Sequence, residues 1–441
     1  MNERIRPRTL KGFRDFLPAM MMPREQVVAT AKKVFHSFGF SPIDTPALEY
    51  SEILIGKGGD ESDKQMYRFE DKGGRDVALR FDLTVPLARF VAQHAGELGM
   101  PFKRYHVGPV WRGENTQRGR YREFLQCDFD TIGTESLAAD AEIGLVTADL
   151  MTALGFERFT IRLNNRRVLT GLLERIGLAD RTVPVLRALD KLGKIGAEGG
   201  RAELKEVASA TDGQVDEIVG LSSLGDAVSE VLDALRATVA GSETGERGLT
   251  ELEVVTSSML GSGVAEGNVR LDVSTARGLD YYTGTVYETY LDDLPDIGSV
   301  CSGGRYDDLA SVYSKQRMPG VGASLGVDRL LAAMEELDLV ESTATTAPVL
   351  VVLFGMERQG DHIALAHRLR HEGIDVELYP EPRKIGAQLK YAARRGHRLA
   401  VIVGDAEWEA GTAQVKDLVT GESMEVPLDG LGAACRGLLG S

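Results

Sequence analysis

The alternation of apolar and polar positions predicts a helix followed by a sheet in the first third of the chain. Apolar residues recur at helical spacing in PREQVVATAKKVFHSFGF, and Gly39 near its end is a natural C-cap. The segment SPIDTPALEYSEIL, with two prolines, favours a strand entered and left through turns. Between Val77 and Ile132 the β-rich runs DVALRF, FKRYHVGPVWRG and EFLQCDFDTIG alternate with turns, and one helix is expected over VPLARFVAQHAG. We therefore predict an antiparallel sheet.

Aromatic residues are missing from the middle of the chain. No Phe, Tyr or Trp occurs between Phe159 and Tyr281, where Leu, Ala, Val, Gly and acidic residues dominate. This pattern predicts a small, mostly helical insertion over residues 170–262. Strand spacing and aromatic residues return in NVRLDVSTARGLDYYTGTVYETYL, so the first sheet is expected to resume there. We expect SLGVDRLLAAMEEL to close it with a strand and a helix.

A stretch of small polar residues, VESTATTAP, precedes the last part of the chain and has the composition of a linker. Beyond it, the strand-like runs PVLVVLF, DVELY and LAVIVG alternate with helical stretches, which predicts a βαβ domain on a mainly parallel sheet. The expected organisation is an α+β domain on an antiparallel sheet with a helical insertion, then an α/β domain. The boundaries are 1–169 and 263–340 for the first domain, 170–262 for the insertion, 341–347 for the linker and 348–441 for the last domain.

Composition is that of an ordinary globular protein. Of the 441 residues, 43% are hydrophobic and 27% charged, and no window reaches the roughly 18 unbroken apolar residues of a membrane helix. The charged N-terminus lacks the apolar run of a secretory signal. The cysteines Cys127, Cys301 and Cys435 are spaced too widely for a Cys-x-x-Cys pair or a disulfide framework. We expect a cytoplasmic protein that has no membrane contact.

Net charge is −15, which taken alone argues against a general nucleic-acid binder. Two stretches run against this average. FKRYHVGPVWRGENTQRGRYRE has six Arg or Lys and two Glu, and Arg383–Arg398 has six Arg or Lys and no acid. A solvated helix face is the usual interpretation of such a run. Because a polyanion meets only one face of a protein, both stretches stay candidates for anion binding.

The common nucleotide-binding and metal-binding motifs are absent from this sequence. There is no Gly-x-x-x-x-Gly-Lys-Ser/Thr loop, and GVGASLG has the wrong glycine spacing for a dinucleotide fingerprint. His367 and His371 stand four positions apart on a predicted helix, but without a third ligand we expect solvated histidines. We predict no tightly bound metal.

Several arginines lie in β-rich, aromatic surroundings: Arg112, Arg120, Arg122, Arg277 and Arg329. The planar, permanently charged guanidinium matches phosphate and carboxylate oxygens. One such arginine is most often part of a structural ion pair. Several that converge on one sheet would be costly without an anion, and a triphosphate would supply it.

Six segments resemble a known family. FSPIDTPALE (with Pro46), FKRYHVGPVWRGENTQRGRYREFLQCDFD and GVGASLGVDRLLAAM resemble motifs 1, 2 and 3 of class II aminoacyl-tRNA synthetases. RGLDYYTGTVYE and CSGGRYDDL resemble the two signature blocks of the histidyl-tRNA synthetase family, and LRFDLTVPLARFVA resembles its segment before motif 2. The resemblance spans nearly the whole chain. It implies ATP with Mg²⁺, L-histidine and tRNA(His) as substrates, a histidyl-adenylate intermediate, a homodimer, and a C-terminal anticodon-binding domain.

The resemblance also implies the ATP contacts. Arg112 is expected on the α-phosphate and the attacking carboxylate, and Glu114 on the adenine amino group. Phe124 is expected to stack on adenine with Arg329 on the opposite face, where Arg329 also reaches the terminal phosphate. Arg120 is expected to hold the triphosphate. Arg277, in ARGLDYYTGTVYE, is the candidate catalytic cation on the side of the α-phosphate opposite Arg112.

The expected histidine-binding residues are Asp82, Thr84, Gln126, Asp130, Arg277, Tyr281, Tyr282 and Tyr306. Thr84, Gln126 and one acid suit an α-ammonium group, and Tyr282 with Asp130 suits the imidazole. Asp82 and Asp130 stand where many bacterial members have glutamate, so their separate roles stay open. Asp82 is also a possible helix N-cap. Since Tyr281 and Tyr282 are expected to alternate on a strand, we place Tyr282 in the site and Tyr281 in the packing, while Tyr306 suits either.

The expected tRNA contacts lie in the basic run of the last domain: Arg383, Lys384, Lys390 and Arg394. Three other functions stay possible. One is a catalytically inactive regulatory paralogue of histidine biosynthesis, although such proteins typically lack the anticodon domain. The others are a non-enzymatic sensor of uncharged tRNA and a class II synthetase for another amino acid.

Overall fold

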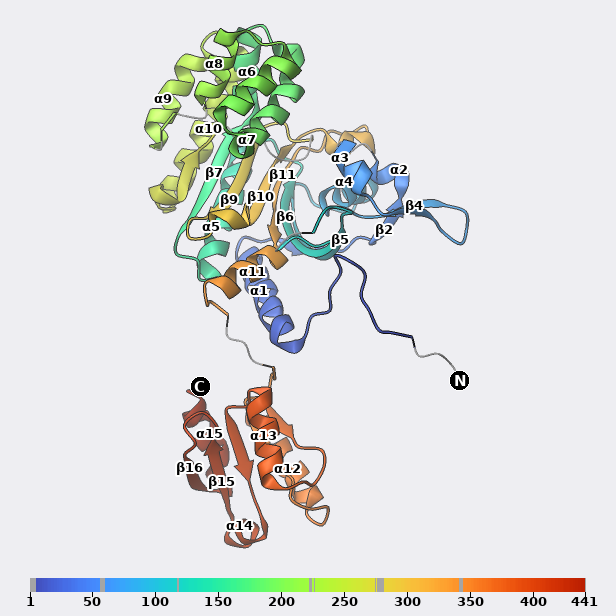
Figure 1. The fold of residues 1–441 in the computed structure, drawn as a ribbon, viewed down its shortest axis with the longest axis vertical. Coiled ribbons are helices and arrows are strands. Elements are labelled where there is room, and N and C mark those ends of the chain that lie inside the picture. Colours follow the sequence, from blue (N-terminus) through green and yellow to red (C-terminus); the bar gives the residue numbers. More distant parts are fainter. Residues whose placement is uncertain are drawn as a thin grey trace. The chain divides into compact units, whose positions relative to one another are not determined.

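The computed structural model describes residues 5–55, 60–116, 119–221, 224–225, 227–273, 275, 281–340 and 344–440 (Figure 1). Arg277 lies outside these residues. The chain divides into two compact units. The first comprises Met1–Arg14 and Gln26–Leu339, and the second comprises Asp15–Glu25 and Val340–Ser441.

Eight strands of the described chain form the main sheet of the first unit, in the order β1-β5-β6-β11-β10-β9-β7-β8. Their bounds are β1 (Ser41–Pro42), β5 (Phe102–Trp111), β6 (Glu123–Ile132), β7 (Phe159–Asn165), β8 (Val269–Leu271), β9 (Thr285–Leu291), β10 (Cys301–Tyr306) and β11 (Gly320–Gly326). The inner pairs are antiparallel, and only the edge pairs β1–β5 and β7–β8 are parallel among the described strands. The predicted antiparallel sheet is confirmed.

One face of β6 lies in the hydrophobic core, because side chains alternate along a strand. Cys127 and Phe129 are buried there, and the Phe129 ring lies 5.1 Å from that of Phe35 between centroids. Phe35 belongs to α1 (Pro18–Ser37). The helices α5 (Leu137–Ala153) and α11 (Val327–Glu336) also contribute buried residues to this core. The opposite face of β6 is therefore free to carry polar groups.

A smaller sheet lies within the same unit. It has the order β2-β4-β3, with β2 (Leu48–Tyr50), β3 (Arg68–Glu70) and β4 (Asp76–Leu79). The neighbouring helices are α2 (Ser51–Leu54), α3 (Asp60–Gln65) and α4 (Thr84–His94). The single strand expected over SPIDTPALEYSEIL is thus wrong, because its prolines and turns divide it into β1, β2 and α2.

Helices fill the segment between β7 and β8, as predicted from its lack of aromatic residues, and they group together in Figure 1. They are α6 (Arg166–Arg175), α7 (Thr182–Ala208), α8 (Asp212–Gly220), α9 (Val228–Val239) and α10 (Glu243–Gly261). Glycine allows α6 and α10 to approach closely: a Cβ on Gly171 would lie 2.3 Å from the Gly245 Cα atom.

The second unit contains a five-stranded sheet in the order β13-β12-β14-β15-β16. Its strands are β12 (Val349–Val351), β13 (Val376–Leu378), β14 (Leu399–Ile402), β15 (Thr412–Asp417) and β16 (Ser423–Pro427). Its helices are α12 (Gln359–His371), α13 (Ile385–Arg395), α14 (Asp405–Ala410) and α15 (Leu431–Leu439). The first two strand pairs are parallel and the last two antiparallel, so the sheet is mixed rather than mainly parallel.

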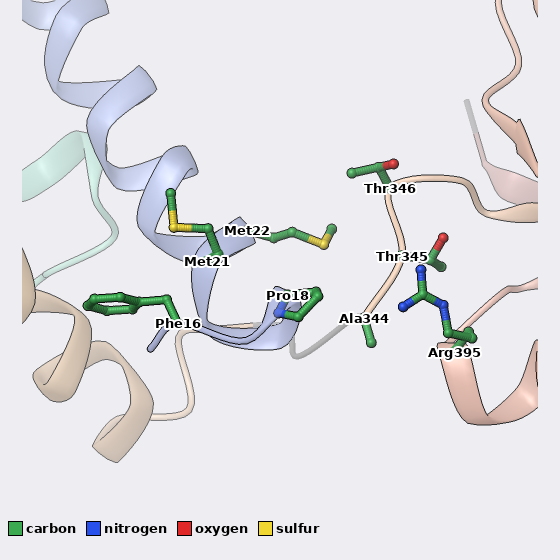
Figure 2. Close-up of a pocket in the computed structure, with 8 residues that line it drawn as sticks. All are labelled: Phe16, Pro18, Met21, Met22, Ala344, Thr345, Thr346 and Arg395. Carbon is green, nitrogen blue, oxygen red and sulfur yellow. The ribbon is translucent and has the colours of Figure 1, made fainter. Parts of the chain in front are cut away.

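A pocket of about 320 Å³ lies in this second unit (Figure 2). It is lined by Phe16, Pro18, Met21, Met22, Ala344, Thr345, Thr346 and Arg395. Arg395 is the single ionisable side chain among these lining residues. The pocket therefore offers no acid–base pair for catalysis, and the candidate chemistry lies on the main sheet of the first unit.

Candidate active site

The polar face of β6 carries Gln126, Asp128 and Asp130, which alternate with the core residues Cys127 and Phe129. All three polar side chains are buried. Buried carboxyls are stable only when hydrogen bonds or opposite charges compensate for the lost water. This row is therefore the natural starting point for a site.

Glycines on the adjacent strands make room for this row. Gly322 pairs with Asp130 across β11 and β6, and a Cβ on Gly322 would lie 2.1 Å from the Asp130 Oδ1 atom. A Cβ on Gly304 of β10 would lie 2.9 Å from the Tyr282 ring. The glycine-rich strand GVGASLG thus gives side chains space on a sheet face.

Asp130 is held by two side chains. The Tyr306 hydroxyl donates a hydrogen bond to Oδ1, and the Arg104 guanidinium lies 2.6 Å from Oδ2. Burial raises the pKa of Asp130, while Arg104 and Tyr306 oppose that rise. Tyr306 is thus packed in a hydrophobic cluster and bonded to Asp130, and its contact with histidine stays a prediction.

Asp82 lies between the start of α4 and the tyrosines. Its Oδ1 accepts a hydrogen bond from the Val85 backbone N–H at 3.1 Å, and its Oδ2 accepts one from the Tyr281 hydroxyl at 3.4 Å. The N-cap of α4 is Leu83 rather than Asp82, although the Asp82 carboxylate bonds the first turn of that helix, and its contact with histidine stays a prediction. Burial raises the pKa of Asp82 to about 6. Thr84, the first residue of α4, is half-buried and interacts with the Tyr281 hydroxyl.

Tyr281 and Tyr282 lie in one aromatic cluster. Their rings meet edge to face with centroids 5.0 Å apart, and Tyr281 lies 5.9 Å from Tyr306. The expected strand alternation of the two residues is wrong, because β9 begins only at Thr285. Burial raises the pKa of both phenols, and the nearby Asp82 and Asp130 carboxylates contribute.

A second cluster, of arginines, lies beyond the end of β5. Arg112 donates through Nε to the Phe81 carbonyl at 2.9 Å, and its guanidinium carbon lies 5.3 Å from the Phe124 ring centroid. Arg120 lies 3.6 Å from the half-buried Glu114 carboxylate.

Arg329, in the first turn of α11, completes this cluster. It donates to the Ser299 carbonyl. Burial lowers the pKa of Arg329 to about 10, and repulsion from Arg120 and Arg112 adds to the effect. Like charges gathered at a half-enclosed site favour an anionic ligand.

One predicted arginine does not join this cluster. Arg122 donates to the backbone carbonyls of Glu114 at 3.2 Å and Lys11 at 3.4 Å, so it holds the N-terminal segment in place. Arg277 lies outside the described residues, and its role stays a prediction.

The predicted tRNA contacts lie on one side of α13 and the turn before it. Arg383, Lys384, Lys390 and Arg394 are exposed, whereas Gln388 and Ala392 of the same segment are buried. Arg383 lies 3.0 Å from the Glu381 carboxylate. An exposed basic face can meet a polyanion without desolvating buried charge.

Sequence reasoning missed Arg104 and Asp128. Arg104 is fully buried and pairs with Asp130, and Asp128 lies between Gln126 and Asp130 on the same face of β6. The alternating spacing Gln126-Asp128-Asp130 was visible in the sequence and is the signal that would have found Asp128. Arg104 had no such signal, because only the pairing of β5 with β6 brings it opposite Asp130.

Neither a metal-ligand cluster nor a membrane-spanning helix is found in the described ranges. Within them no three His, Cys, Asp or Glu side chains are grouped as metal ligands would be. The His367 and His371 rings contact each other, with centroids 4.4 Å apart. No described helix has the length and apolarity that crossing a membrane requires.

Known proteins resemble this chain along its whole length. A family model described as histidyl-tRNA synthetase matches residues 12–330, and one described as anticodon binding domain matches residues 348–438. A "Histidine--tRNA ligase" of Rhodopirellula baltica is 57% identical over 422 residues, which is 96% of each chain. One of Wolinella succinogenes is 48% identical over 438 residues, 99% of each chain.

Solved structures give the same result. The crystal structure of histidyl-tRNA synthetase from Nostoc sp. PCC 7120 has a TM-score of 0.89 and 35% identity, and covers 98% of this chain and 99% of that one. A Bacillus halodurans protein described as an ATP phosphoribosyltransferase regulatory subunit/histidyl-tRNA synthetase shares the fold, with a TM-score of 0.75 and 24% identity.

Proposed function

The chain belongs to the histidyl-tRNA synthetase family, and from this premise we infer that it ligates L-histidine to tRNA(His) with ATP. It is a class II aminoacyl-tRNA synthetase of protein synthesis. The observation that carries the assignment is a buried cluster of carboxylates and tyrosines beside a cluster of arginines, with Arg112 close enough to act on the charge of Asp82. The first suits a cationic amino acid and the second a triphosphate.

The reaction has two steps. An oxygen of the histidine carboxylate attacks the α-phosphorus of ATP, forming histidyl-adenylate and releasing pyrophosphate. A hydroxyl of the terminal tRNA ribose then attacks the carbonyl carbon, and AMP leaves. Neither step needs a covalent bond to the protein, so catalysis consists of positioning and charge stabilisation.

We assign ATP to the arginine cluster. Arg112 contacts the α-phosphate, and Arg120 and Arg329 contact the remaining phosphates, which relieves the repulsion that lowers the Arg329 pKa. Adenine stacks on Phe124, with Glu114 accepting from its amino group. ATP enters as its Mg²⁺ complex, so the metal arrives with the substrate.

We assign histidine to the carboxylate–tyrosine pocket. Its proposed contacts are Asp82, Thr84, Gln126, Asp130, Tyr281, Tyr282 and Tyr306. A pocket of buried polar groups discriminates strongly, because an amino acid that leaves them unpaired loses their hydrogen bonds. Arg277 is the proposed catalytic cation opposite Arg112.

The remaining proposals concern assembly. Residues 1–169 and 263–340 form the catalytic domain around a helical insertion at 170–262, and a linker at 341–347 leads to the anticodon-binding domain at 348–441. Exposed Arg383, Lys384, Lys390 and Arg394 contact tRNA(His). We propose a cytoplasmic homodimer, and the exposed apolar side chains Tyr50 and Phe69 of the small sheet favour such an interface.

Histidine-dependent exchange of pyrophosphate into ATP tests this function directly. The purified protein is expected to catalyse exchange with L-histidine and not with the other amino acids. Exchange with a different amino acid would refute the specificity. Absence of any exchange would favour the regulatory paralogue, which the identity to ligases over 96% of the chain disfavours.

A further inference from the structure

Asp128 has a carboxyl oxygen that nothing in the described chain satisfies. The residue is 1% exposed, and its Oδ1 has no hydrogen-bond partner among the described residues. The carboxyl does interact with the Ser324 hydroxyl, which pairs across from it on β11. An unsatisfied buried acceptor is expensive, so Oδ1 is a candidate acceptor for a donor on a bound ligand.

The basic groups nearest to Asp128 contact other acceptors, although the Arg104 Nε and His106 Nδ1 atoms have no hydrogen-bond partner among the described residues. Arg104 reaches the Asp130 carboxylate at 2.6 Å and contacts only the main-chain carbonyl of Asp128, at 3.5 Å. His106 pairs with Asp128 across β5 and β6, but its Nε2 lies 2.9 Å from the Asp44 carboxylate. Burial, aided by Arg104, lowers the His106 pKa to about 3, so this ring is neutral.

Two further arginines lie near the pocket without pairing with it. Arg80 donates to the backbone carbonyls of Pro109 and Thr45. Arg112 donates to that of Phe81 and faces the proposed phosphate site. Neither forms an ion pair with Asp128 within the residues that the structure describes.

Negative charge therefore exceeds paired positive charge around the proposed histidine site. The buried carboxyls of Asp82, Asp128 and Asp130 outnumber the guanidinium that pairs with them, because only Arg104 forms an ion pair with one of the three among the described residues, and the buried Arg80 acts on Asp128 only through its charge at longer range. Burial raises the pKa of all three carboxyls, that of Asp128 to about 7. A ligand that brings positive charge to these carboxyls would offset this excess. Histidine brings its ammonium group, its ring supplies a second positive charge once it is protonated, and its carboxylate faces the arginine cluster.

We propose that Asp128 is a substrate-binding residue whose free oxygen accepts a ring N–H of histidine bound with a protonated imidazole. Asp130, held by Tyr306 and Arg104, then lies beside it, and Arg104 is a positioning residue. The ring proton comes from solvent or from the Asp128 carboxyl, so only N–H and O–H bonds change. The inference rests on the proposed function and adds the charge state of the substrate.

The first experiment uses the full chain and L-histidine with ¹⁵N in its ring. At about pH 8 free histidine has a neutral ring. The bound ring is expected to give the ¹⁵N shifts of imidazolium. A neutral bound ring would overturn the proposal, even where histidine-dependent exchange proves the enzyme active. Absence of any histidine binding would overturn both this inference and the proposed function.

The second experiment compares Asp128→Asn with the wild type. The dissociation constant for histidine is expected to rise about 10- to 100-fold, the range for a lost charged hydrogen bond. 2-Fluorohistidine, with a ring of similar shape but far lower basicity, is expected to bind the wild type more weakly than histidine does. That difference should largely disappear in the variant. Equal weakening of both ligands would mean a structural role and would overturn the proposal.

Asp140→Asn is the matched control. Asp140 is also a fully buried carboxyl with a raised pKa, but it pairs with Arg305 outside the pocket. Arg305 keeps Asp307 as a second carboxylate, at 3.2 Å. The control is expected to lower the melting temperature while leaving the ratio of histidine to 2-fluorohistidine binding unchanged. A changed ratio in this control would also overturn the assignment.

Discussion

At the scale of single residues, the chemistry depends on where positive charge meets the α-phosphate. Arg112 is placed by its bond to the Phe81 carbonyl, and Arg277 is the proposed second cation. Replacing Arg277 by Ala is expected to remove roughly 2–3 kcal/mol of transition-state stabilisation, by analogy with the loss of one electrostatic donor. Pyrophosphate exchange measures this loss as a fall in kcat/KM. An unchanged adenylation rate would refute the role, and Arg277→Lys, which retains the charge, should recover part of the activity.

The buried carboxyl of Asp128 makes a separate prediction for stability. Its pKa is raised to about 7 in the folded chain, so folding holds a proton there that the unfolded chain releases near its ordinary pKa of about 4. Its ionisation thus destabilises the fold increasingly as pH rises between these two values. Asp128→Asn removes this penalty. Urea denaturation measures the free energy of unfolding of the variant and of the wild type. The variant should gain stability relative to the wild type when the pH is raised from about 5 to about 8. A pH-independent difference would contradict the raised pKa.

At the scale of elements, strand pairing turns separate sequence motifs into one site. Gly322 lies opposite Asp130, and the carboxyl occupies the space that a Cβ would take. Gly322→Ala is therefore expected to displace Asp130 from Tyr306 and Arg104, raising KM for histidine by about tenfold or more. Steady-state kinetics with varied histidine provides the measurement.

Gly386→Ala is the control for this substitution. Gly386 lies in α13, and a Cβ there would meet no atom within 4 Å. Alanine should stabilise that helix by up to about 1 kcal/mol and leave KM for histidine unchanged. If both variants behaved alike, the close approach of Gly322 to Asp130 would have no functional meaning.

The same elements show how far sequence reading reaches. The β-rich run EFLQCDFDTIG predicted β6, but its period of two, which separates the polar from the core face and would have found Asp128, was not used. The rule does not apply to Tyr281 and Tyr282, because both precede β9 and so lie outside a strand. The partners of Asp130 were also beyond reach, since Arg104 and Tyr306 arrive from strands distant in sequence. Local periodicity thus predicts which side chains share one face of a strand, and only the order of strands in the sheet shows which side chains of neighbouring strands meet.

At the scale of the whole molecule, a chain with net charge −15 must attract a polyanion locally. The exposed basic face of α13 is the proposed means. Lys390→Ala with Arg394→Ala is expected to raise KM for tRNA(His) and to flatten its dependence on salt, because fewer counterions are released on binding. Pyrophosphate exchange, which needs no tRNA, should be unaffected.

Lys32→Ala with Lys33→Ala removes the same charge from exposed positions of α1 and serves as the control. Its aminoacylation should keep the wild-type salt dependence. An equal loss of salt dependence in both double variants would point to a general field effect and against a tRNA contact on α13.

The crowding of Arg112, Arg120 and Arg329 has a further consequence for the direction of the reaction. In the proposed site, released pyrophosphate would relieve the same repulsion as ATP, so the product is expected to compete with ATP. Turnover in a cell is then expected to depend on a phosphohydrolase that removes pyrophosphate. Phosphate-rich buffers should mimic the product, slowing the enzyme while protecting it from heat.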